Sequence, residues 1–232
     1  MKQVLLTVEK NEKIALNTFK MILSGDAGEI TKPGQFVNIK LGGFYLRRPI
    51  SVCDKTDNTL TIIYKTVGNG TNVMSELENG AVLDVLTGLG NGYNTDKSGN
   101  NPVLIGGGAG VPPMYLLCKK LISEGKTPSV ILGFNTKEEV FYKDEFESLG
   151  IKGFVTDALK NIDYSYFYTC GPEPMFRAVA KNVKTAGQYS FEERMGCGFG
   201  ACMGCSCKTL TGNKRICKDG PVMESEEIIW DD

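Results

Sequence analysis

The sequence predicts three structural parts in order: an antiparallel β-barrel over residues 1–99, an α/β domain over residues 100–190, and a small C-terminal domain over residues 191–232. Short runs of β-branched and aromatic residues, separated by turn-forming clusters, fill the first part. In the second part a strand, a glycine-rich loop and a helical segment follow one another, as in a parallel sheet. Regularly spaced cysteines dominate the last part. The predicted fold class is a multi-domain β plus α/β protein.

Composition excludes several classes of function. The 232 residues include 26 basic and 27 acidic side chains and no histidine. Because the charges nearly cancel and no basic block occurs, we expect no binding of nucleic acid. The lack of histidine rules out imidazole catalysis and His-ligated metals, including a Rieske cluster. No residue of the chain is assigned a catalytic role, so we expect its chemistry to come from bound cofactors.

The distribution of apolar residues along the chain bears on where in the cell the protein is expected. The chain contains no apolar run near the roughly 18 residues that a membrane helix requires. It begins Met1-Lys2-Gln3-Val4, without a basic-then-apolar signal region. We therefore expect a cytoplasmic protein that is not associated with a membrane.

The barrel is predicted from five β-rich runs at residues 4–8, 14–23, 36–39, 59–64 and 81–86. Turn-forming clusters at residues 24–28 and 57–58 separate some of them. About six short strands at this spacing are typical of a closed barrel.

Two stretches of the barrel carry groups that suit a phosphorylated ligand. Residues 47–51 place the guanidinium groups of Arg47 and Arg48, a proline and a hydroxyl together, which suits a phosphate and an electron-rich ring. Residues 67–72 are glycine-rich and precede a helical segment at 73–77, so their N–H groups and the Thr71 hydroxyl suit an anion. Taken singly, these stretches are better explained as a surface basic pair and an ordinary capped turn, but their joint occurrence in a barrel ahead of the next motif favours a bound ligand.

The α/β part begins with a strand at residues 102–105, followed by a glycine loop and a helix at 114–122 that Gly125 ends. This order predicts a pyrophosphate-binding turn, although Val111 replaces the third glycine of G-x-G-x-x-G and leaves a purely structural turn as an alternative. Further strands are predicted at 130–134 and 164–169. The second of them ends at Cys170, which therefore lies either near a reacting centre or in the core. Cys53 and Cys118 are expected to be small buried residues.

The last part contains Cys197, Cys202, Cys205 and Cys217 in the pattern C-x4-C-x2-C-x11-C. This is the plant-type spacing for the four thiolates of a 2Fe-2S cluster. The intervening glycines allow positive φ and close approach of backbone N–H groups to the cluster sulfurs. Zinc is an alternative, but it usually takes two C-x2-C pairs, and disulfides require an oxidising compartment. Cys207 is a spare thiol beside the loop and a fifth candidate ligand, which we expect to point away from the same metal.

The order of these motifs resembles the ferredoxin-reductase superfamily and, within it, the electron-transfer subunits of NAD-dependent class 1B dihydroorotate dehydrogenases. The resemblance covers essentially the whole chain and includes the closing segment Cys217-Lys218-Asp219-Gly220-Pro221-Val222. It implies a flavin-binding barrel, a Rossmann-like nucleotide domain and a C-terminal 2Fe-2S domain. It implies that FAD is bound by Arg48, Pro49, Ile50, Ser51, Ile63, Tyr64, Lys65, Gly70 and Thr71. It likewise assigns NAD to Gly106, Gly107, Gly108, Ala109, Gly110, Cys170, Gly171 and Pro172, and the cluster to the four cysteines above.

The same resemblance implies a function in de novo pyrimidine (UMP) biosynthesis. Dihydroorotate would be oxidised on a separate FMN-containing catalytic subunit, in a heterotetramer with two copies of each chain. Electrons would then pass through the 2Fe-2S cluster and FAD to NAD+, because a flavin exchanges both hydride and single electrons. Alternatives are a reductase subunit of a hydrogenase, a sulfide dehydrogenase or a bifurcating transhydrogenase, and a zinc-stabilised binding module.

Two departures from the family pattern concern the nucleotide site. Between Leu149 and Gly153 the chain lacks a further strand and an acidic, glycine-containing turn that the family usually has, so the sheet is expected to be one strand short. Residues 133–137 contain neither an acidic residue for a ribose diol nor an arginine for a 2′-phosphate, so the preference for NAD over NADP rests on the resemblance. An apolar rim at the partner interface, or else local packing, is expected from Phe199, Met203, Ile228, Ile229 and Trp230.

Overall fold

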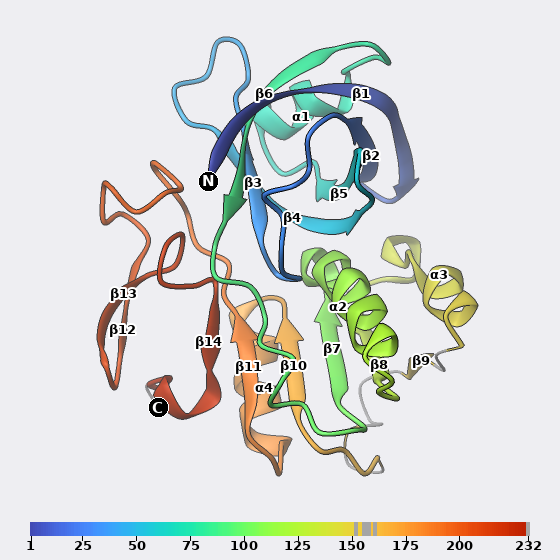
Figure 1. The fold of residues 1–232 in the computed structure, drawn as a ribbon, viewed down its shortest axis with the longest axis vertical. Coiled ribbons are helices and arrows are strands. Elements are labelled where there is room, and N and C mark those ends of the chain that lie inside the picture. Colours follow the sequence, from blue (N-terminus) through green and yellow to red (C-terminus); the bar gives the residue numbers. More distant parts are fainter. Residues whose placement is uncertain (151–152, 155–158, 160–161, 231–232) are drawn as a thin grey trace.

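The computed structural model describes residues 1–150, 153–154, 159 and 162–230. The N-terminal barrel forms one end of an elongated molecule, and the α/β domain forms the other (Figure 1). The C-terminal segment runs along one side of both parts, so that it lies beside the junction between them (Figure 1).

Six antiparallel strands form the closed barrel that the sequence predicts, in the spatial order β1-β2-β5-β4-β3-β6. Their inward side chains, among them Leu6, Met21 and Leu60, form one buried apolar core. A short helix, α1, follows β5. The bounds are β1 Lys2–Ala15, β2 Thr18–Ser24, β3 Phe36–Ile39, β4 Arg48–Lys55, β5 Thr59–Lys65, α1 Asn69–Ser75 and β6 Val82–Leu89.

Two details of the predicted barrel are wrong. The run at residues 14–23 is not one strand, because β1 continues to Ala15 and the chain turns at Asn17, whose φ is 52°. Asparagine tolerates this left-handed conformation, so a hairpin turn forms inside an otherwise β-rich run. In addition, residues 48–55 were not predicted as a strand, although they form β4 with Pro49 inside it.

The α/β domain contains a six-stranded sheet in the order β14-β11-β10-β7-β8-β9. Five strands are parallel, and β14 pairs antiparallel with β11 at one edge. Helix α2 packs on both β7 and the barrel strand β4, so it joins the two domains. The bounds are β7 Val103–Gly107, α2 Val111–Ser123, β8 Ser129–Gly133, α3 Lys143–Ser148, β9 Gly153–Phe154, β10 Phe167–Cys170, α4 Glu173–Asn182 and β11 Gly187–Ser190.

The predicted helix after the glycine loop is confirmed, although it starts three residues earlier at Val111, with prolines in its first turn. Gly125 follows its end with φ 77°, as expected of a helix-terminating glycine. The strand that this chain was expected to lack would fall between Leu149 and Gly153, where residues 151–152 lie outside the described residues. The described part places Gly153 and Phe154 in parallel register with β8.

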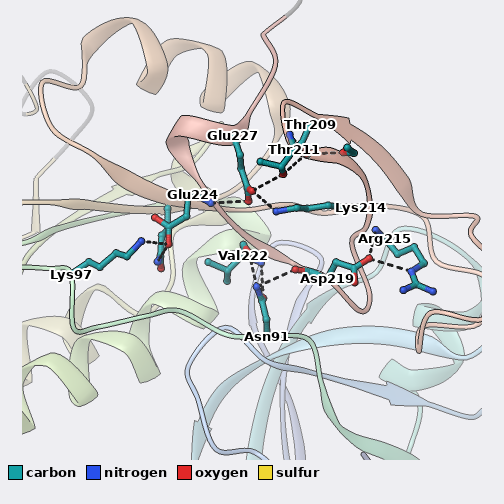
Figure 2. Close-up of polar contacts among 12 residues, drawn as sticks. Asn91, Lys97, Thr209, Thr211, Lys214, Arg215, Asp219, Val222, Glu224 and Glu227 are labelled. Atoms are coloured by element: carbon teal, nitrogen blue, oxygen red, sulfur yellow. Dashed lines mark hydrogen bonds and ion pairs between the residues drawn. The ribbon is translucent and has the colours of Figure 1, made fainter.

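The C-terminal segment contributes the hairpin β12 Ser206–Thr209 and β13 Gly212–Arg215, and then β14 Val222–Glu224. It also binds the linker between barrel and sheet: Asn91 donates to the carbonyl of Val222 at 2.7 Å and accepts from its N–H at 3.1 Å (Figure 2). Lys97 pairs with Glu224 at 3.1 Å (Figure 2). The third part therefore packs on both others, and its boundary at residues 190–191 stays a prediction.

None of the helices in the described ranges has the length and apolar character needed to cross a membrane.

Candidate functional site

A pocket of about 400 Å³ lies where the barrel meets the α/β domain, and we call it the junction pocket. Eight of the nine residues predicted to bind FAD line it, together with two of those predicted for NAD. It also contains residues that the sequence did not single out. The lining residues are Phe36, Arg48, Pro49, Ile50, Ser51, Ile63, Tyr64, Lys65, Val67, Thr71, Ala109, Cys170, Ser190, Phe191, Glu192, Glu193, Met195 and Pro221.

The two adjacent arginines have different roles. Arg47 turns away and pairs with Asp84 at 2.9 Å, while also donating to the Asp84 carbonyl at 3.0 Å. Arg48 lines the junction pocket, with its guanidinium 4.6 Å from the centre of the Phe44 ring. It has no carboxylate partner within 4.0 Å among the described residues. Of the two arginines, only Arg48 therefore keeps at the pocket a positive charge that no carboxylate of the described residues offsets.

The first turn of α1 closes the pocket beside Arg48. The Thr71 hydroxyl oxygen accepts hydrogen bonds from the backbone N–H groups of Val67 at 2.9 Å and Gly68 at 3.2 Å, so it organises this turn. Gly70 does not line the pocket itself, but a Cβ there would lie 2.0 Å from Nε of Arg48. Glycine at this position lets the guanidinium lie directly on the turn.

Tyr64 and Lys65, two barrel residues of the pocket wall, form polar contacts with other parts of the structure. The Tyr64 hydroxyl donates to Oδ1 of Asn11 at 2.9 Å, and burial raises the pKa of Tyr64 to about 12. Lys65 pairs with Glu139 of the α/β domain at 3.2 Å. The Lys65 ion pair therefore bridges the two domains at the edge of the pocket.

The glycine loop and the end of β10 meet as the sequence predicts. A Cβ at Gly110 would lie 2.1 Å from the carbonyl oxygen of Cys170, so this glycine allows the two backbones to touch. A Cβ at Gly107 would lie 2.4 Å from Sδ of Met175 in α4. Val111, in place of the third motif glycine, is fully buried in the core. The close approach is made at Gly110 instead, which explains why valine is accommodated at the next position.

Four of the eight predicted NAD residues line two cavities, whereas Gly106, Gly107, Gly108 and Gly110 line neither of them. Ala109 and Cys170 line the junction pocket, whereas Gly171 and Pro172 line a neighbouring cavity of about 300 Å³ beside α4. Cys170 is 1% exposed, and burial raises the pKa of its thiol. It is therefore a neutral thiol at the pocket wall. Cys53 and Cys118 are buried core thiols, as expected.

The strand β11 also ends at the pocket, although the sequence did not signal this. Ser190, Phe191 and Glu192 follow its parallel pairing with β10 and enter the lining. Desolvation raises the pKa of the Glu192 carboxyl group. The rule that ligands gather at the carboxyl ends of parallel strands applies to this strand too, but β11 is only four residues long and lacked a β-rich signal.

The four predicted cluster cysteines come together as two pairs. Backbone N–H of Cys197 lies 3.4 Å from Sγ of Cys202, and the N–H of Cys217 lies 3.4 Å from Sγ of Cys205. A binuclear iron cluster takes two thiolates per iron, whereas structural zinc takes four donors around one point. The paired thiols therefore fit a 2Fe-2S cluster.

Electrostatics distinguish the two pairs. Desolvation acts to raise the pKa of Cys197, but N–H groups of Phe199, Cys202 and Ala201 outweigh it and lower this pKa to about 6. Desolvation raises the pKa of the Cys217 thiol. The amides of the glycine loop thus favour thiolate at Cys197, as a cluster ligand requires. Cys207 is half-buried and lines the cavity beside α4.

Of the expected apolar rim, only the loop residues are exposed. Phe199 is 44% and Met203 53% exposed, on either side of the exposed Cys202. Trp230 packs edge-on against Tyr189, with ring centres 5.3 Å apart. Ile228 and Trp230 pack against buried clusters, whereas Ile229 lines the cavity beside α4.

Comparison with known proteins agrees with this geometry. Residues 192–229 match the family model of the iron-sulfur cluster binding domain of dihydroorotate dehydrogenase B. The dihydroorotate dehydrogenase B (NAD+) electron transfer subunit of Fusobacterium nucleatum is 42% identical over 250 residues, covering 96% of each chain. The chain belongs to this family of electron transfer subunits. Its Geobacillus member is 41% identical, and that match covers 99% of each chain.

Solved structures show the same fold. A chain of the NADH-dependent reduced ferredoxin-NADP oxidoreductase superposes on the present protein with a TM-score of 0.88 at 26% identity. The match covers 98% of the present chain and 90% of the other. Phthalate dioxygenase reductase superposes with a TM-score of 0.69 at 16% identity, covering 90% and 87% of the two chains. The arrangement of barrel, parallel sheet and C-terminal cysteine segment is therefore that of a ferredoxin-reductase-like protein.

Proposed function

We propose that this chain is the electron-transfer subunit of an NAD-linked dihydroorotate dehydrogenase in pyrimidine biosynthesis. Its role is to pass electrons from an FMN-containing catalytic subunit, by way of a 2Fe-2S cluster and FAD, to NAD+. One observation carries the proposal: a pocket lined by the predicted flavin residues lies at the nucleotide domain on one side and beside the paired cysteines on the other. Phe36 belongs both to the pocket lining and to the buried cluster that contains Cys205 and Cys217.

The residues divide the work. Bound FAD would interconvert hydride and single-electron transfer, which neither nicotinamide nor an iron-sulfur cluster does alone. Arg48 would bind the flavin phosphates through charge-assisted hydrogen bonds, and the turn containing Gly70 and Thr71 would hold the pyrophosphate. The strand edges at Pro49–Ser51 and Ile63–Lys65 would enclose the flavin ring and exclude water. Ala109 and Cys170 would face the nicotinamide, with the glycine loop holding its pyrophosphate.

Partner and location follow from the same proposal. The exposed Phe199 and Met203 beside Cys202 suit an apolar contact with the catalytic subunit, in a heterotetramer of two copies of each chain. All eight cysteines have free thiols, which supports a reducing compartment such as the cytoplasm. At the end of β8 no acidic residue is available for a ribose diol, so the preference for NAD over NADP is taken from the family.

The test is to purify the complex without oxygen, identify what copurifies, and measure dihydroorotate-driven reduction of NAD+. An FMN-containing partner and formation of NADH would support the proposal. A chain that holds FAD and cluster, yet yields no NADH with that partner, would refute it.

A second candidate function follows from the structural match to the NADH-dependent reduced ferredoxin-NADP oxidoreductase. A subunit of a bifurcating complex would exchange electrons with ferredoxin and would not respond to dihydroorotate. Reduction of ferredoxin in place of dihydroorotate oxidation would favour this candidate.

A further inference from the structure

The outer face of β3 lies between the junction pocket and the cysteine loop. Phe36 and Asn38 alternate along this strand with two residues of the barrel core. Because successive side chains of a strand point to opposite faces, Phe36 and Asn38 point out of the barrel. Phe36 contributes to the cluster that holds Cys205 and Cys217, whereas Asn38 reaches the first ligand, Cys197. One short strand thus contacts both cysteine pairs.

The Asn38 side chain is fully buried, and its amide donates a 3.1 Å hydrogen bond to the carbonyl oxygen of Cys197. Its Oδ1 has no hydrogen-bond partner within the described ranges. An unpaired buried acceptor is destabilising, so an apolar side chain of the same size would fill this space at lower cost. The presence of an amide here is therefore explained by its bond to the cysteine loop.

The cysteine loop is shaped to receive this side chain. Gly198 has φ 77°, and a Cβ there would lie 2.3 Å from Nδ2 of Asn38. Any other residue at 198 would both strain the backbone and displace the amide from the Cys197 carbonyl. The glycine thus serves the contact with the barrel as well as the turn of the loop.

Asn38 is itself firmly held. Its backbone carbonyl accepts a hydrogen bond from Arg47 at 3.3 Å, and Arg47 is fixed by Asp84. Asn38 also lies opposite Pro49 in the β3–β4 register, next to the strand edge that lines the junction pocket. A rigid part of the flavin side is therefore bonded to the first cluster ligand, across 159 positions of sequence.

We propose that Asn38 is a positioning residue, which anchors the Cys197 half of the cluster loop to the flavin barrel. This rests on the proposed function, because it requires both cofactors. Since the peptide after Cys197 is planar and trans, anchoring its carbonyl directs the Gly198 N–H away from Asn38. The N–H groups of Ala201 and Cys202, in the same loop, lie 3.2 and 3.5 Å from Sγ of Cys197. Asn38 thereby sets the hydrogen bonds that tune the cluster and the separation of cluster from flavin.

The experiment compares the wild-type holoprotein with Asn38→Leu, which fills the space without a donor, and Gly198→Ala, which displaces the amide. Gly212→Ala is the matched control: Gly212 has φ 114°, but a Cβ there meets no atom within 4 Å. Iron, sulfide and FAD content, iron release to a chelator, the EPR spectrum and the potential of the cluster are measured. Stopped-flow absorbance follows flavin reduction by NADH and the subsequent electron transfer to the cluster.

We expect both variants to retain FAD and to be reduced by NADH at the wild-type rate. They should release iron roughly two- to tenfold faster, as the loss of one neutral hydrogen bond implies. They should also show a changed EPR spectrum, a shifted potential and slower flavin-to-cluster transfer, with Gly212→Ala unchanged. If Asn38→Leu does not fold, Gly198→Ala decides the question because it leaves Asn38 in place.

The inference would be overturned if the folded variants released iron at the wild-type rate and kept the wild-type EPR spectrum and cluster potential. A wild-type protein that binds no FAD or no iron would overturn the proposed function instead. The two failures are distinguishable, because the measurements on the isolated chain do not depend on dihydroorotate or on the partner subunit.

Discussion

Substitution of Gly70 by alanine should weaken flavin binding without destabilising the fold. The added Cβ would lie 2.0 Å from Nε and 2.3 Å from Nη2 of Arg48, far inside contact distance. The clash involves the end of a flexible side chain, so the guanidinium can move away at little cost. Gly70 lies inside α1, where alanine is a better helix former by about 1 kcal/mol. The free energy of unfolding should therefore be unchanged or slightly higher.

The magnitude follows from what Arg48 would lose. A hydrogen bond to a charged group contributes about 1.5–3 kcal/mol, which corresponds to roughly a tenfold to 150-fold change in Kd. Among the described residues no carboxylate pairs with Arg48, so its displacement breaks no ion pair of the protein. Displacement would also end the contacts of the guanidinium with the Phe44 ring and the Leu46 carbonyl, so the larger part of the effect, but not all of it, should appear in FAD affinity.

The assay is fluorescence titration of the deflavinated protein with FAD, with thermal unfolding in parallel. Gly68→Ala is the control, since Gly68 is extended, with φ −177°, and a Cβ there would meet nothing within 4 Å. An unchanged Kd for Gly70→Ala would refute the role of Arg48. An equal loss in Gly68→Ala would show that the turn, and not the guanidinium, is responsible.

Three further predictions concern the other parts of the protein. Cys202→Ser should lose the cluster and keep FAD, and full iron and acid-labile sulfide in that variant would contradict the ligand assignment. Gly110→Ala should lower the free energy of unfolding by about 1–3 kcal/mol, because its Cβ would lie 2.1 Å from the Cys170 carbonyl oxygen; Gly133→Ala, where the nearest atom is 3.8 Å away, should have little effect in the same denaturant titration. Desolvation acts to raise the pKa of Glu124, but hydrogen bonds from lysine and threonine side chains outweigh it and lower this pKa. The ionised carboxylate therefore stabilises the folded state above the ordinary carboxyl pKa, and this stabilisation is lost as the pH falls through the lowered pKa. Glu124→Gln should therefore cost about 1 kcal/mol at pH 7, and this cost should shrink as the pH falls below the ordinary carboxyl pKa; a pH-independent difference would contradict this account.

Local patterns predicted most of the fold. Turn clusters between β-rich runs predicted the closed barrel, and the order of strand, glycine loop and helix predicted β7 and α2. The errors occurred where a local signal was ambiguous. The turn at Asn17 is hidden in a run of strand-forming residues, and Pro49 is uncommon inside a strand. The attachment of β14 to the sheet could not be predicted, because three residues carry too little periodicity.

For the candidate site, the sequence indicated which kinds of cofactor could bind, but not which residues contact one another in the fold. The cysteine spacing alone indicated a four-thiolate cluster, and the structure groups those cysteines in two pairs. The adjacent Arg47 and Arg48 are chemically identical, and only the position of Asp84 on β6 decides which of them is neutralised. Asn38 gave no signal, since its partner is 159 positions away.

The sequence by itself determined the kinds of chemistry open to this protein: no histidine, one thiolate set, and two glycine-containing turns suited to phosphates. These depend on residue type and on spacings of a few positions, which survive any arrangement of the domains. Only the tertiary structure decided that the flavin residues, Cys170 and the end of β11 share one pocket, with the cluster loop seated on β3 beside it. Those contacts arise from closure of the barrel and from docking of the C-terminal segment, where burial and shape join residues that no local pattern connects.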